Sequence, residues 1–328
     1  MRSQPAVEAT GLEKSYRGKG KGAGKAPVPV LRGIDLRVEP GTVFALLGPN
    51  GAGKTTAVRI LTTLTAPDRG TVRVAGYDVV ADRRRVRGAI SLTGQFAAVD
   101  EKQTGAENLR MMARLGGLSR AAARRRAAEL LDRFDLAGSG HRLAATYSGG
   151  MRRRLDLAAG LVGTPEVVFL DEPTTGLDPR SRQELWQVVR DLATQGSTIF
   201  LTTQYLEEAD RLADRIAVMD RGLIAAEGTV DELKSLVSGH RLDLVLTSPD
   251  AYLRLADRAV HHAPGSLTLG LPTDGSAAQV RALLDEIDPD GTEVARFALH
   301  STTLDDVFLS LTRSSAHSDP HPKESARV

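Results

Sequence analysis

The most constraining feature of the sequence is an octapeptide at residues 48–55, Gly-Pro-Asn-Gly-Ala-Gly-Lys-Thr, which fits the pattern G-x-x-x-x-G-K-[ST]. In such a loop, successive backbone N–H groups point inward and form a concavity that binds phosphate groups. An apolar, strand-like stretch at 43–47 precedes the loop, and Ala57, Ile60, Leu61 and Leu64 follow it at the spacing of one helix face. The pattern therefore predicts a strand, a phosphate-binding loop, and a helix whose positive dipole end faces the phosphates.

Two side chains of this loop suit a nucleoside triphosphate. Lys54 is long enough to reach the outer phosphates, and the Thr55 hydroxyl is a suitable ligand for Mg²⁺. A glycine-rich turn without a ligand is the alternative, which the flanking strand and helix patterns disfavour. The residues expected to contact the nucleotide are Gly48, Pro49, Asn50, Gly51, Ala52, Gly53, Lys54, Thr55 and Thr56.

A second anion-binding segment is predicted at residues 147–152, Tyr-Ser-Gly-Gly-Met-Arg. Ser148 is a favourable helix N-cap, and apolar residues at helical spacing follow as far as Leu161. A hydroxyl and the N–H groups of Gly149 and Gly150 at a helix N-terminus form a site for an anion. Taken alone, the segment would be interpreted as an ordinary capped helix.

Two adjacent carboxylates end a predicted strand at residues 166–172, Glu-Val-Val-Phe-Leu-Asp-Glu. The run is short, apolar and β-branched, which is typical of a parallel strand buried on both faces. Ligands of such sheets bind at the carboxyl ends of the strands. Asp171 is therefore expected to hold Mg²⁺ through water, and Glu172 to act as the general base toward an attacking water. A solvated acidic turn is the alternative for this segment alone.

Composition excludes several classes of protein. The 328 residues contain no cysteine, which excludes disulfides, thiolate metal sites and cysteine nucleophiles. The net charge is +2, and the arginine triplets at 83–85, 124–126 and 152–154 have few aromatic neighbours, so we do not expect nucleic-acid binding. Neither a secretory signal nor an apolar run of about 18 residues occurs, so we expect a cytoplasmic protein whose transport pore, if any, is another polypeptide.

The first domain is expected at residues 6–235. Residues 6–47 and 70–80 are predicted to form an antiparallel sheet, and about 98–165 a helical subdomain. A glycine- and lysine-rich stretch at 17–25 is predicted to be a mobile loop. This loop is either a tolerated insertion or a contact for nucleotide or anionic lipid.

A small α+β domain is expected at residues 239–313, where strand and helix patterns restart. Its last helix has a capping-box-like Thr303-x-x-Asp306 at its start. The apolar face of that helix either closes the core of the domain or mediates assembly. Residues 314–328 are polar and are predicted to form a disordered tail.

Taken in order, these segments resemble the ATP-binding-cassette (ABC) ATPases. The resemblance runs from about Val7 to Thr312 and is strongest with a drug-export branch, the ATP-binding subunits of daunorubicin/doxorubicin resistance transporters. The segments that carry it are 147–156 (YSGGMRRRLD), 174–182 (TTGLDPRSR) and 202–210 (TTQYLEEAD). The resemblance implies an α/β P-loop ABC ATPase fold with a parallel core sheet, an antiparallel β subdomain, a helical subdomain and a small C-terminal α+β domain.

The same resemblance implies roles for further residues. Tyr16 matches the aromatic residue that stacks on adenine, and Gln95 the glutamine that contacts Mg²⁺ and senses the transmembrane partner. The segment 148–150 matches the family signature, which reaches the γ-phosphate bound by a second subunit. Asp178 lies in the loop that links the two sites of the dimer, and Gln204 stands where the family has a catalytic histidine. The chain also departs from the family at Tyr147 and Met151, where leucine and glutamine are usual.

The function implied by the resemblance is that of an ATP-hydrolysing subunit of a drug or antibiotic exporter. Its expected ligands are ATP and Mg²⁺. Its expected partners are a second copy of itself, which forms a nucleotide sandwich, and a separate transmembrane permease that holds it at the cytoplasmic face of the membrane. The alternative is a non-transport ABC ATPase that acts as a soluble assembly or regulatory factor. The single phosphate loop and the absence of cysteine disfavour translation-type and repair-type members, respectively.

Overall fold

The computed structural model describes the chain in five stretches, residues 4–17, 27–94, 99–236, 240–300 and 303–316. The predicted loop at 17–25 therefore lies almost wholly outside the described residues, and Gln95 lies outside them as well. The chain divides into two compact units, residues 1–229 and 230–328, which are described separately below.

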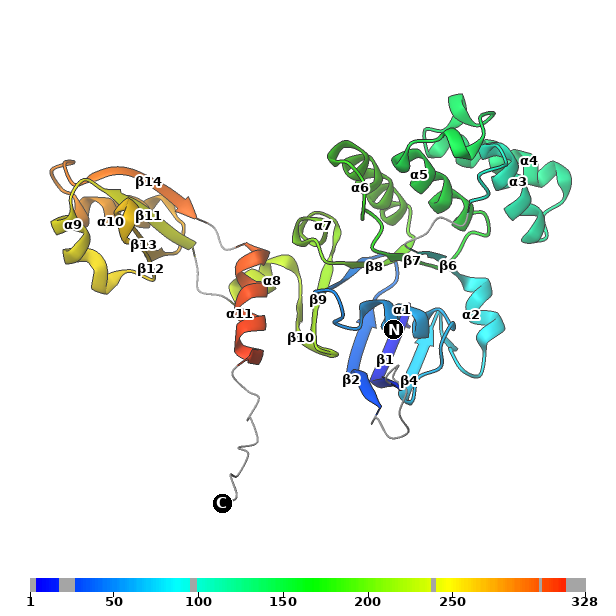
Figure 1. Ribbon diagram of the computed structural model, residues 1–328, viewed down its shortest axis with the longest axis horizontal. Coiled ribbons are helices and arrows are strands. Elements are labelled where there is room, and N and C mark those ends of the chain that lie inside the picture. Colours follow the sequence, from blue (N-terminus) through cyan, green and yellow to red (C-terminus); the bar gives the residue numbers. More distant parts are fainter. Residues whose placement is uncertain (1–3, 18–26, 95–98, 237–239, 301–302, 317–328) are drawn as a thin grey trace, which may run out of the picture. The chain divides into compact units, whose positions relative to one another are not determined.

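The first unit is built on a six-stranded sheet in the order β10-β9-β3-β8-β7-β6 (Figure 1). The five strands β9, β3, β8, β7 and β6 pair in parallel with their neighbours. The edge strand β10 pairs antiparallel with β9. All five residues of β3 and of β7 are buried, as expected for strands covered on both faces. The strands are β3 (Val43–Leu47), β6 (Ile90–Thr93), β7 (Val167–Asp171), β8 (Thr198–Thr203), β9 (Arg215–Asp220) and β10 (Leu223–Gly228).

Helices follow the strands as expected for a parallel sheet with crossovers. Three of them, α3, α4 and α5, pack together and form the predicted helical part (Figure 1). The helices of this unit are α1 (Lys54–Leu61), α2 (Arg83–Ala89), α3 (Gly105–Leu115), α4 (Arg120–Arg133), α5 (Gly149–Gly160), α6 (Pro179–Thr194) and α7 (Leu206–Leu212).

The antiparallel sheet predicted from residues 6–47 and 70–80 is confirmed except at residues 43–47, which form β3 of the parallel sheet. Its strands have the order β2-β1-β4-β5, namely β1 (Val7–Tyr16), β2 (Val28–Val38), β4 (Arg69–Val74) and β5 (Tyr77–Asp78). Its buried side chains share one hydrophobic cluster with α1 and the parallel sheet, including Ile34, Ile60 and Phe44. This shared core fixes the loop between β3 and α1.

The prediction for the helix after the phosphate loop was partly wrong. The helix α1 ends at Leu61, so Leu64 does not continue its buried face and is 56% exposed. The chain turns at Thr63, whose φ of 65° lies in the left-handed region. A helix cannot continue through that conformation.

The second unit contains a four-stranded antiparallel sheet in the order β12-β13-β11-β14. Leucines that alternate along β11 and β13 are buried in its core with side chains of α9 and α10. The elements of this sheet and its helices are β11 (His240–Leu246), α9 (Pro249–Leu255), β12 (His261–Ala263), β13 (Thr268–Thr273), α10 (Ala277–Ile287) and β14 (Val294–His300).

The remaining helices of the second unit, α8 (Val230–Ser235) and α11 (Leu304–Ala316), contact each other. The predicted capping box is confirmed, since the Thr303 hydroxyl accepts the Asp306 N–H at 3.3 Å and the Asp306 carboxylate accepts the Thr303 N–H at 2.9 Å. Leu304 and Val307 are 4% and 1% exposed, so the apolar face of α11 is packed. Among the described residues, no helix is long and apolar enough to cross a membrane.

Candidate functional site

The loop between β3 and α1 has the backbone that its glycines require. Gly53 has a φ of 115°, a left-handed conformation that favours glycine, and it begins α1. A Cβ atom at Gly48 would lie 2.3 Å from the carbonyl oxygen of Met219 on β9, so only glycine allows this approach. The predicted strand and loop are therefore confirmed, as is the helix as far as Leu61, and the N–H groups at the start of α1 are available to an anion.

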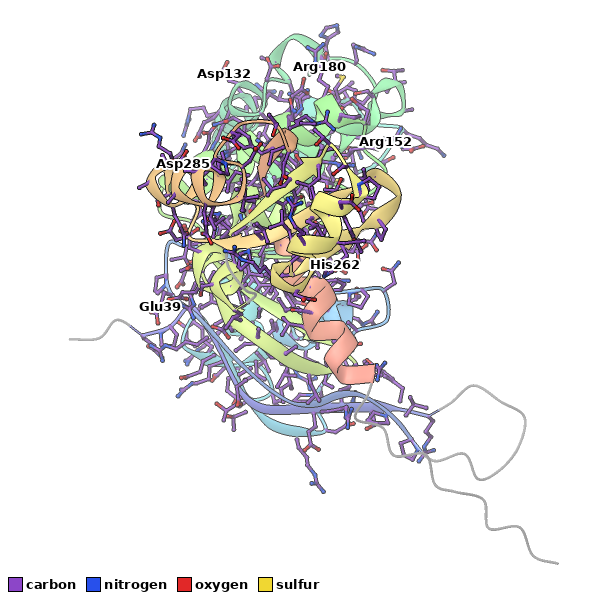
Figure 2. All side chains as sticks on the ribbon, turned by 90° about the vertical axis from the view of Figure 1, so that its left-hand side faces the viewer. Glu39, Asp132, Arg152, Arg180, His262 and Asp285 are labelled. Carbon is purple, nitrogen blue, oxygen red and sulfur yellow. The ribbon has the colours of Figure 1, made fainter. Side chains whose placement is uncertain are left out.

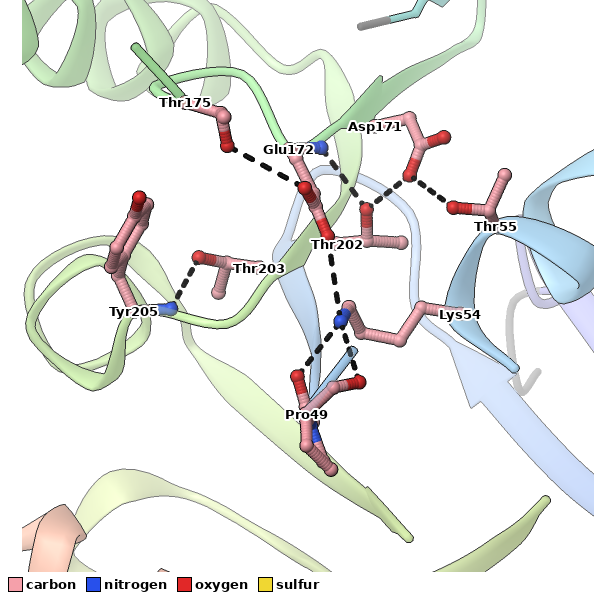
Figure 3. Close-up of polar contacts among 10 residues, drawn as sticks. Pro49, Lys54, Thr55, Asp171, Glu172, Thr175, Thr202, Thr203 and Tyr205 are labelled. Carbon is pink, nitrogen blue, oxygen red and sulfur yellow. Dashed lines mark hydrogen bonds and ion pairs between the residues drawn. The ribbon is translucent and has the colours of Figure 1, made fainter. Parts of the chain in front are cut away.

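Lys54 lies across the loop (Figure 3). Its ammonium donates to the carbonyl oxygens of Gly48 and Pro49 at 2.8 and 3.1 Å, and lies 3.5 Å from the Glu172 carboxylate. Burial lowers the pKa of Lys54, while the Glu172 and Asp171 carboxylates oppose this effect. The outer phosphates of a nucleotide would offer this ammonium stronger, charge-assisted hydrogen bonds than the two carbonyls do.

Asp171 lies at the carboxyl end of β7, where its orientation is fixed by two threonines (Figure 3). Its Oδ1 accepts the Thr202 hydroxyl at 2.6 Å and the Thr55 hydroxyl at 3.4 Å. Sequence reasoning missed Thr202, although its place at the end of the neighbouring strand β8 was a usable signal. Since carboxylate and hydroxyl oxygens are the ligands that Mg²⁺ prefers, Asp171 and Thr55 fit that ion.

Glu172 has an unusual backbone conformation. Its φ is 49°, a left-handed value in a residue other than glycine, and its N–H donates to the Thr202 hydroxyl at 3.1 Å. The side chain is 10% exposed and lies between the Lys54 ammonium and the Thr175 hydroxyl, which donates to it at 3.5 Å. A carboxylate in this position can accept a proton from a water that attacks a phosphate held by the loop.

A cavity of about 410 Å³ joins these groups. Its lining includes Asn50, Gly51, Gly53, Lys54, Thr55, Thr56 and Glu172, together with Val30 on β2. The structure thus brings the predicted phosphate-binding residues and the predicted general base to one place. Tyr16 does not line this cavity, and its ring is 40% exposed at the end of β1.

Gln204 follows β8 directly, in a turn that its neighbours shape. The Thr203 hydroxyl accepts the Tyr205 N–H at 2.9 Å (Figure 3). The Thr203 carbonyl accepts the N–H of Gly48 at 3.2 Å. The Arg182 guanidinium lies 5.1 Å from the centre of the Tyr205 ring. The Gln204 side chain makes no hydrogen bond with any residue the structure describes, so its amide is available to a ligand.

Behind this turn, Glu208 is a fully buried carboxyl group that sequence reasoning missed. Its Oε1 accepts the indole N–H of Trp186 at 3.1 Å, which joins α7 to α6. Burial raises the pKa of Glu208, while the hydroxyl of Thr203, the indole of Trp186 and the Arg182 charge act in the opposite direction. An apolar environment of this kind favours the neutral, protonated acid.

The second predicted anion segment has the expected local form. Ser148 is the N-cap of α5, and its hydroxyl accepts the Met151 N–H at 3.2 Å. Ser148 and Gly149 are exposed, and none of Ser148, Gly149 and Gly150 lines the cavity at the phosphate loop. Tyr147 is 5% exposed, and its hydroxyl donates to the Ser139 carbonyl at 2.8 Å.

Asp178 is placed as the N-cap of α6, where its carboxylate accepts the Ser181 N–H at 3.1 Å. Hydrogen bonds from Ser181 lower the pKa of Asp178. The residue is exposed, and its neighbour Arg180 projects from the same end of α6 into solvent (Figure 2). This end of α6 is therefore accessible to another molecule.

Comparison with known proteins relates this chain to one family. A family model described as "ABC transporter" matches residues 31–175. Over 322 residues the chain is 49% identical to the daunorubicin/doxorubicin resistance ATP-binding protein DrrA of Streptomyces peucetius, a match that covers 95% of this chain and 94% of the relative. It is 46% identical to the doxorubicin resistance ATP-binding protein DrrA of Mycobacterium tuberculosis, over 96% of both chains.

A solved structure described as the ATP-binding subunit of an ABC transporter superposes with a TM-score of 0.60 at 28% identity. The match covers 70% of this chain and 92% of that one. The α/β P-loop fold predicted from the sequence is thereby confirmed.

Proposed function

The chain belongs to the ABC transporter family and is an ATP-binding and ATP-hydrolysing subunit; we propose that it powers drug export through a separate transmembrane permease. The observation that carries the proposal is that Lys54 and Glu172 line the cavity at the phosphate loop, and that Asp171 accepts a hydrogen bond from Thr55, which lines it too. The choice of drugs as cargo is supported by the near full-length similarity to the drug-resistance relatives.

We propose separate roles for the residues that line the cavity and for Gln204, which follows β8. The loop N–H groups and Lys54 bind the phosphates and stabilise the charge that develops on the transferred phosphoryl group. Glu172 accepts a proton from the attacking water, and Gln204 donates an amide hydrogen bond to the γ-phosphate.

Mg²⁺ is expected to bind together with the nucleotide. Among the described residues, no cluster of three or more His, Cys, Asp and Glu side chains could hold a metal ion by itself. Thr55 and Asp171 would hold the ion with the nucleotide phosphates, and Gln95 is the third proposed ligand. The ion supplies charge that neutralises the phosphate oxygens.

A second copy of the chain is proposed to complete each site. Ser148, Gly149 and Gly150 form an exposed helix N-terminus that does not line the cavity of their own chain. Such an N-terminus suits the γ-phosphate of an ATP held by a partner copy. Tyr16 is proposed to stack on the adenine, and Asp178 to lie at the contact between copies.

The transport proposal is tested by searching the neighbouring genes for a membrane protein with six predicted spanning helices and co-expressing the chain with it. Inverted membrane vesicles should take up doxorubicin in the presence of ATP, and vesicles carrying Glu172→Gln should not. The chain should also sediment with membranes only when that protein is present, as expected of a peripheral subunit on the cytoplasmic face. ATP hydrolysis without uptake or membrane association would instead support the alternative, a soluble assembly or regulatory factor.

A further inference from the structure

Arg153 on α5 is a buried arginine that bonds to two other segments of the site. It is 8% exposed. Its Nε donates to the carbonyl oxygen of Pro173 at 2.9 Å, and its Nη1 donates to the carbonyl oxygen of Gly94. Pro173 directly follows Glu172, and Gly94 directly precedes Gln95. One side chain therefore joins α5, whose N-cap is Ser148, to the segment after Glu172 and to the segment before Gln95.

The charge of Arg153 is partly compensated within the core. Its Nη1 lies 3.6 Å from the carboxylate of Asp156, which is also buried. Burial lowers the pKa of Arg153, whereas Asp156, Glu208 and Asp171 oppose this effect. The third nitrogen, Nη2, is buried without a hydrogen-bond partner among the described residues.

This arrangement is poorly explained by packing alone. A buried ion pair is often no more stabilising than apolar residues of similar volume, and an unpaired buried donor is unfavourable. The next residue, Arg154, offers a comparison, because it is also largely buried but forms ion pairs with Asp135 and Glu184, at 3.6 Å each. Within the described residues, Arg154 therefore makes no hydrogen bond or ion pair with Gly94 or Pro173, which Arg153 holds.

We propose that Arg153 is a positioning residue that holds the segment after Glu172 and the segment before Gln95 in fixed relation to α5. The proposal rests on the proposed roles of Glu172 as general base and of Ser148 as a ligand of the partner's ATP. A planar guanidinium presents several donors in fixed directions, so it can hold two backbone carbonyls at once. When the N-terminus of α5 binds a nucleotide, Arg153 therefore holds both segments in a fixed position relative to that nucleotide.

The test uses the double variant Arg153→Met/Asp156→Asn, which removes both buried charges together and keeps side-chain volume. We expect its Kd and KM for ATP to stay within about twofold of the parent, since the phosphate loop is unchanged. We expect kcat to fall about tenfold or more, because misplacement of a reacting group by about an ångström can slow a reaction a hundredfold. A merely structural role predicts instead that the double variant, if folded, turns over like the parent.

Two further variants make the result decisive. Arg154→Met removes a neighbouring, largely buried arginine and should lower the melting temperature without lowering kcat more than about twofold. Arg153→Lys keeps the charge opposite Asp156 but cannot hold both carbonyls, so it too should lower kcat at unchanged ATP affinity. If the double variant does not fold, Arg153→Lys alone tests the proposal.

The single tryptophan supplies a readout other than activity. Trp186 is 2% exposed and bonded to Glu208, close to the Gln204 turn, so its emission should change when ATP binds to the parent. In the Arg153 variants this change should be reduced, although ATP binds. Parent-like kcat and parent-like emission in these variants would overturn the proposal for Arg153 and leave ATP hydrolysis by the parent intact, whereas an inactive parent would overturn the proposed function itself.

Discussion

At the scale of single residues, the site depends on Glu172 being held in a strained position. A left-handed conformation outside glycine costs about 1–3 kcal/mol and persists only where the surroundings impose it. Here the N–H of Glu172 is bonded to Thr202, while its carboxylate lies 3.5 Å from Lys54. The conformation places the carboxylate beside the Lys54 ammonium at the phosphate loop, as the proposed role of general base requires.

The first prediction concerns that carboxylate. Glu172→Gln should bind ATP as the parent does but slow turnover about a hundredfold or more, since the amide cannot accept a proton. The variant should accumulate as an ATP-bound dimer. Steady-state hydrolysis measures its turnover, and gel filtration with ATP measures the dimer. Glu166→Gln, an exposed carboxylate at the start of the same segment, is the control. Near-parental turnover of Glu172→Gln would remove Glu172 from the role of base.

The second prediction concerns Gln204, which has a neutral amide where the resemblance to the wider ABC family implies a histidine. Gln204→Ala should slow hydrolysis markedly, by about tenfold, because it removes a donor to the γ-phosphate. Gln204→His should support hydrolysis and add a pH-dependent limb near the ordinary histidine pKa of about 6.5, which the parent lacks. Gln187→Ala, on the exposed side of α6, is the control. An alanine variant as fast as the parent would exclude Gln204 from the site.

At the scale of elements, α6 and α7 form one interface behind the site. The Trp186–Glu208 hydrogen bond, the Arg182 contact with Tyr205 and the Arg211 guanidinium 5.7 Å from the Trp186 ring all join these two helices. Asp178 is the N-cap of α6, and Gln204 lies in the turn before α7. The interface therefore joins two segments for which we propose contacts with nucleotide or with a second copy.

The third prediction follows from the raised pKa of Glu208. The folded state holds this proton more tightly than the unfolded chain does, whose ordinary value is 4.5. The stability that the protonated acid contributes is fully present below that value and is lost as the pH rises through the folded-state pKa. Gln cannot ionise and still accepts the Trp186 N–H, so Glu208→Gln should gain stability relative to the parent as the pH rises.

Thermal unfolding of both proteins between pH 5 and pH 8 checks this prediction. The difference in melting temperature, variant minus parent, should increase with pH. Glu207→Gln removes an exposed carboxylate on the same helix and should show a flat difference, which makes it the matched control. A difference for Glu208→Gln that is constant or decreases with pH would show that Glu208 is not held neutral by burial.

Much of the element order could be predicted from the sequence because local patterns determine it. The strand–loop–helix around Lys54, the N-cap at Ser148 and the strand that ends at Asp171 each have a signal within a few residues. The carbonyl contacts of Arg153 and the buried carboxyl of Glu208 had no such signal, because they join segments far apart in the sequence. The end of α1 before Leu64 was also missed, since the turn at Thr63 depends on backbone conformation and not on an apolar pattern.

At the scale of the whole molecule, each chain carries the two parts of the proposed ATP site in separate places. The cavity holds the phosphate loop, Lys54 and Glu172, whereas the α5 N-terminus at Ser148 is exposed and lines no part of it. Two copies that exchange these half-sites would each complete the other. ATP would then close the pair and hydrolysis would open it, which is the ligand-driven change that a permease could use.

The fourth prediction tests that central claim most directly, by measuring ATP hydrolysis in mixed dimers. Lys54→Ala and Ser148→Arg homodimers should both be inactive, because each has a lesion in both of its sites. Heterodimers of the two should hydrolyse ATP at least about tenfold faster than either, since one site has both lesions and the other has none. Heterodimers of Lys54→Ala with Glu172→Gln, which leave a lesion in each site, should remain inactive. If a verified Lys54→Ala/Ser148→Arg heterodimer is as inactive as the homodimers, the sites are not shared between two copies and the account is wrong.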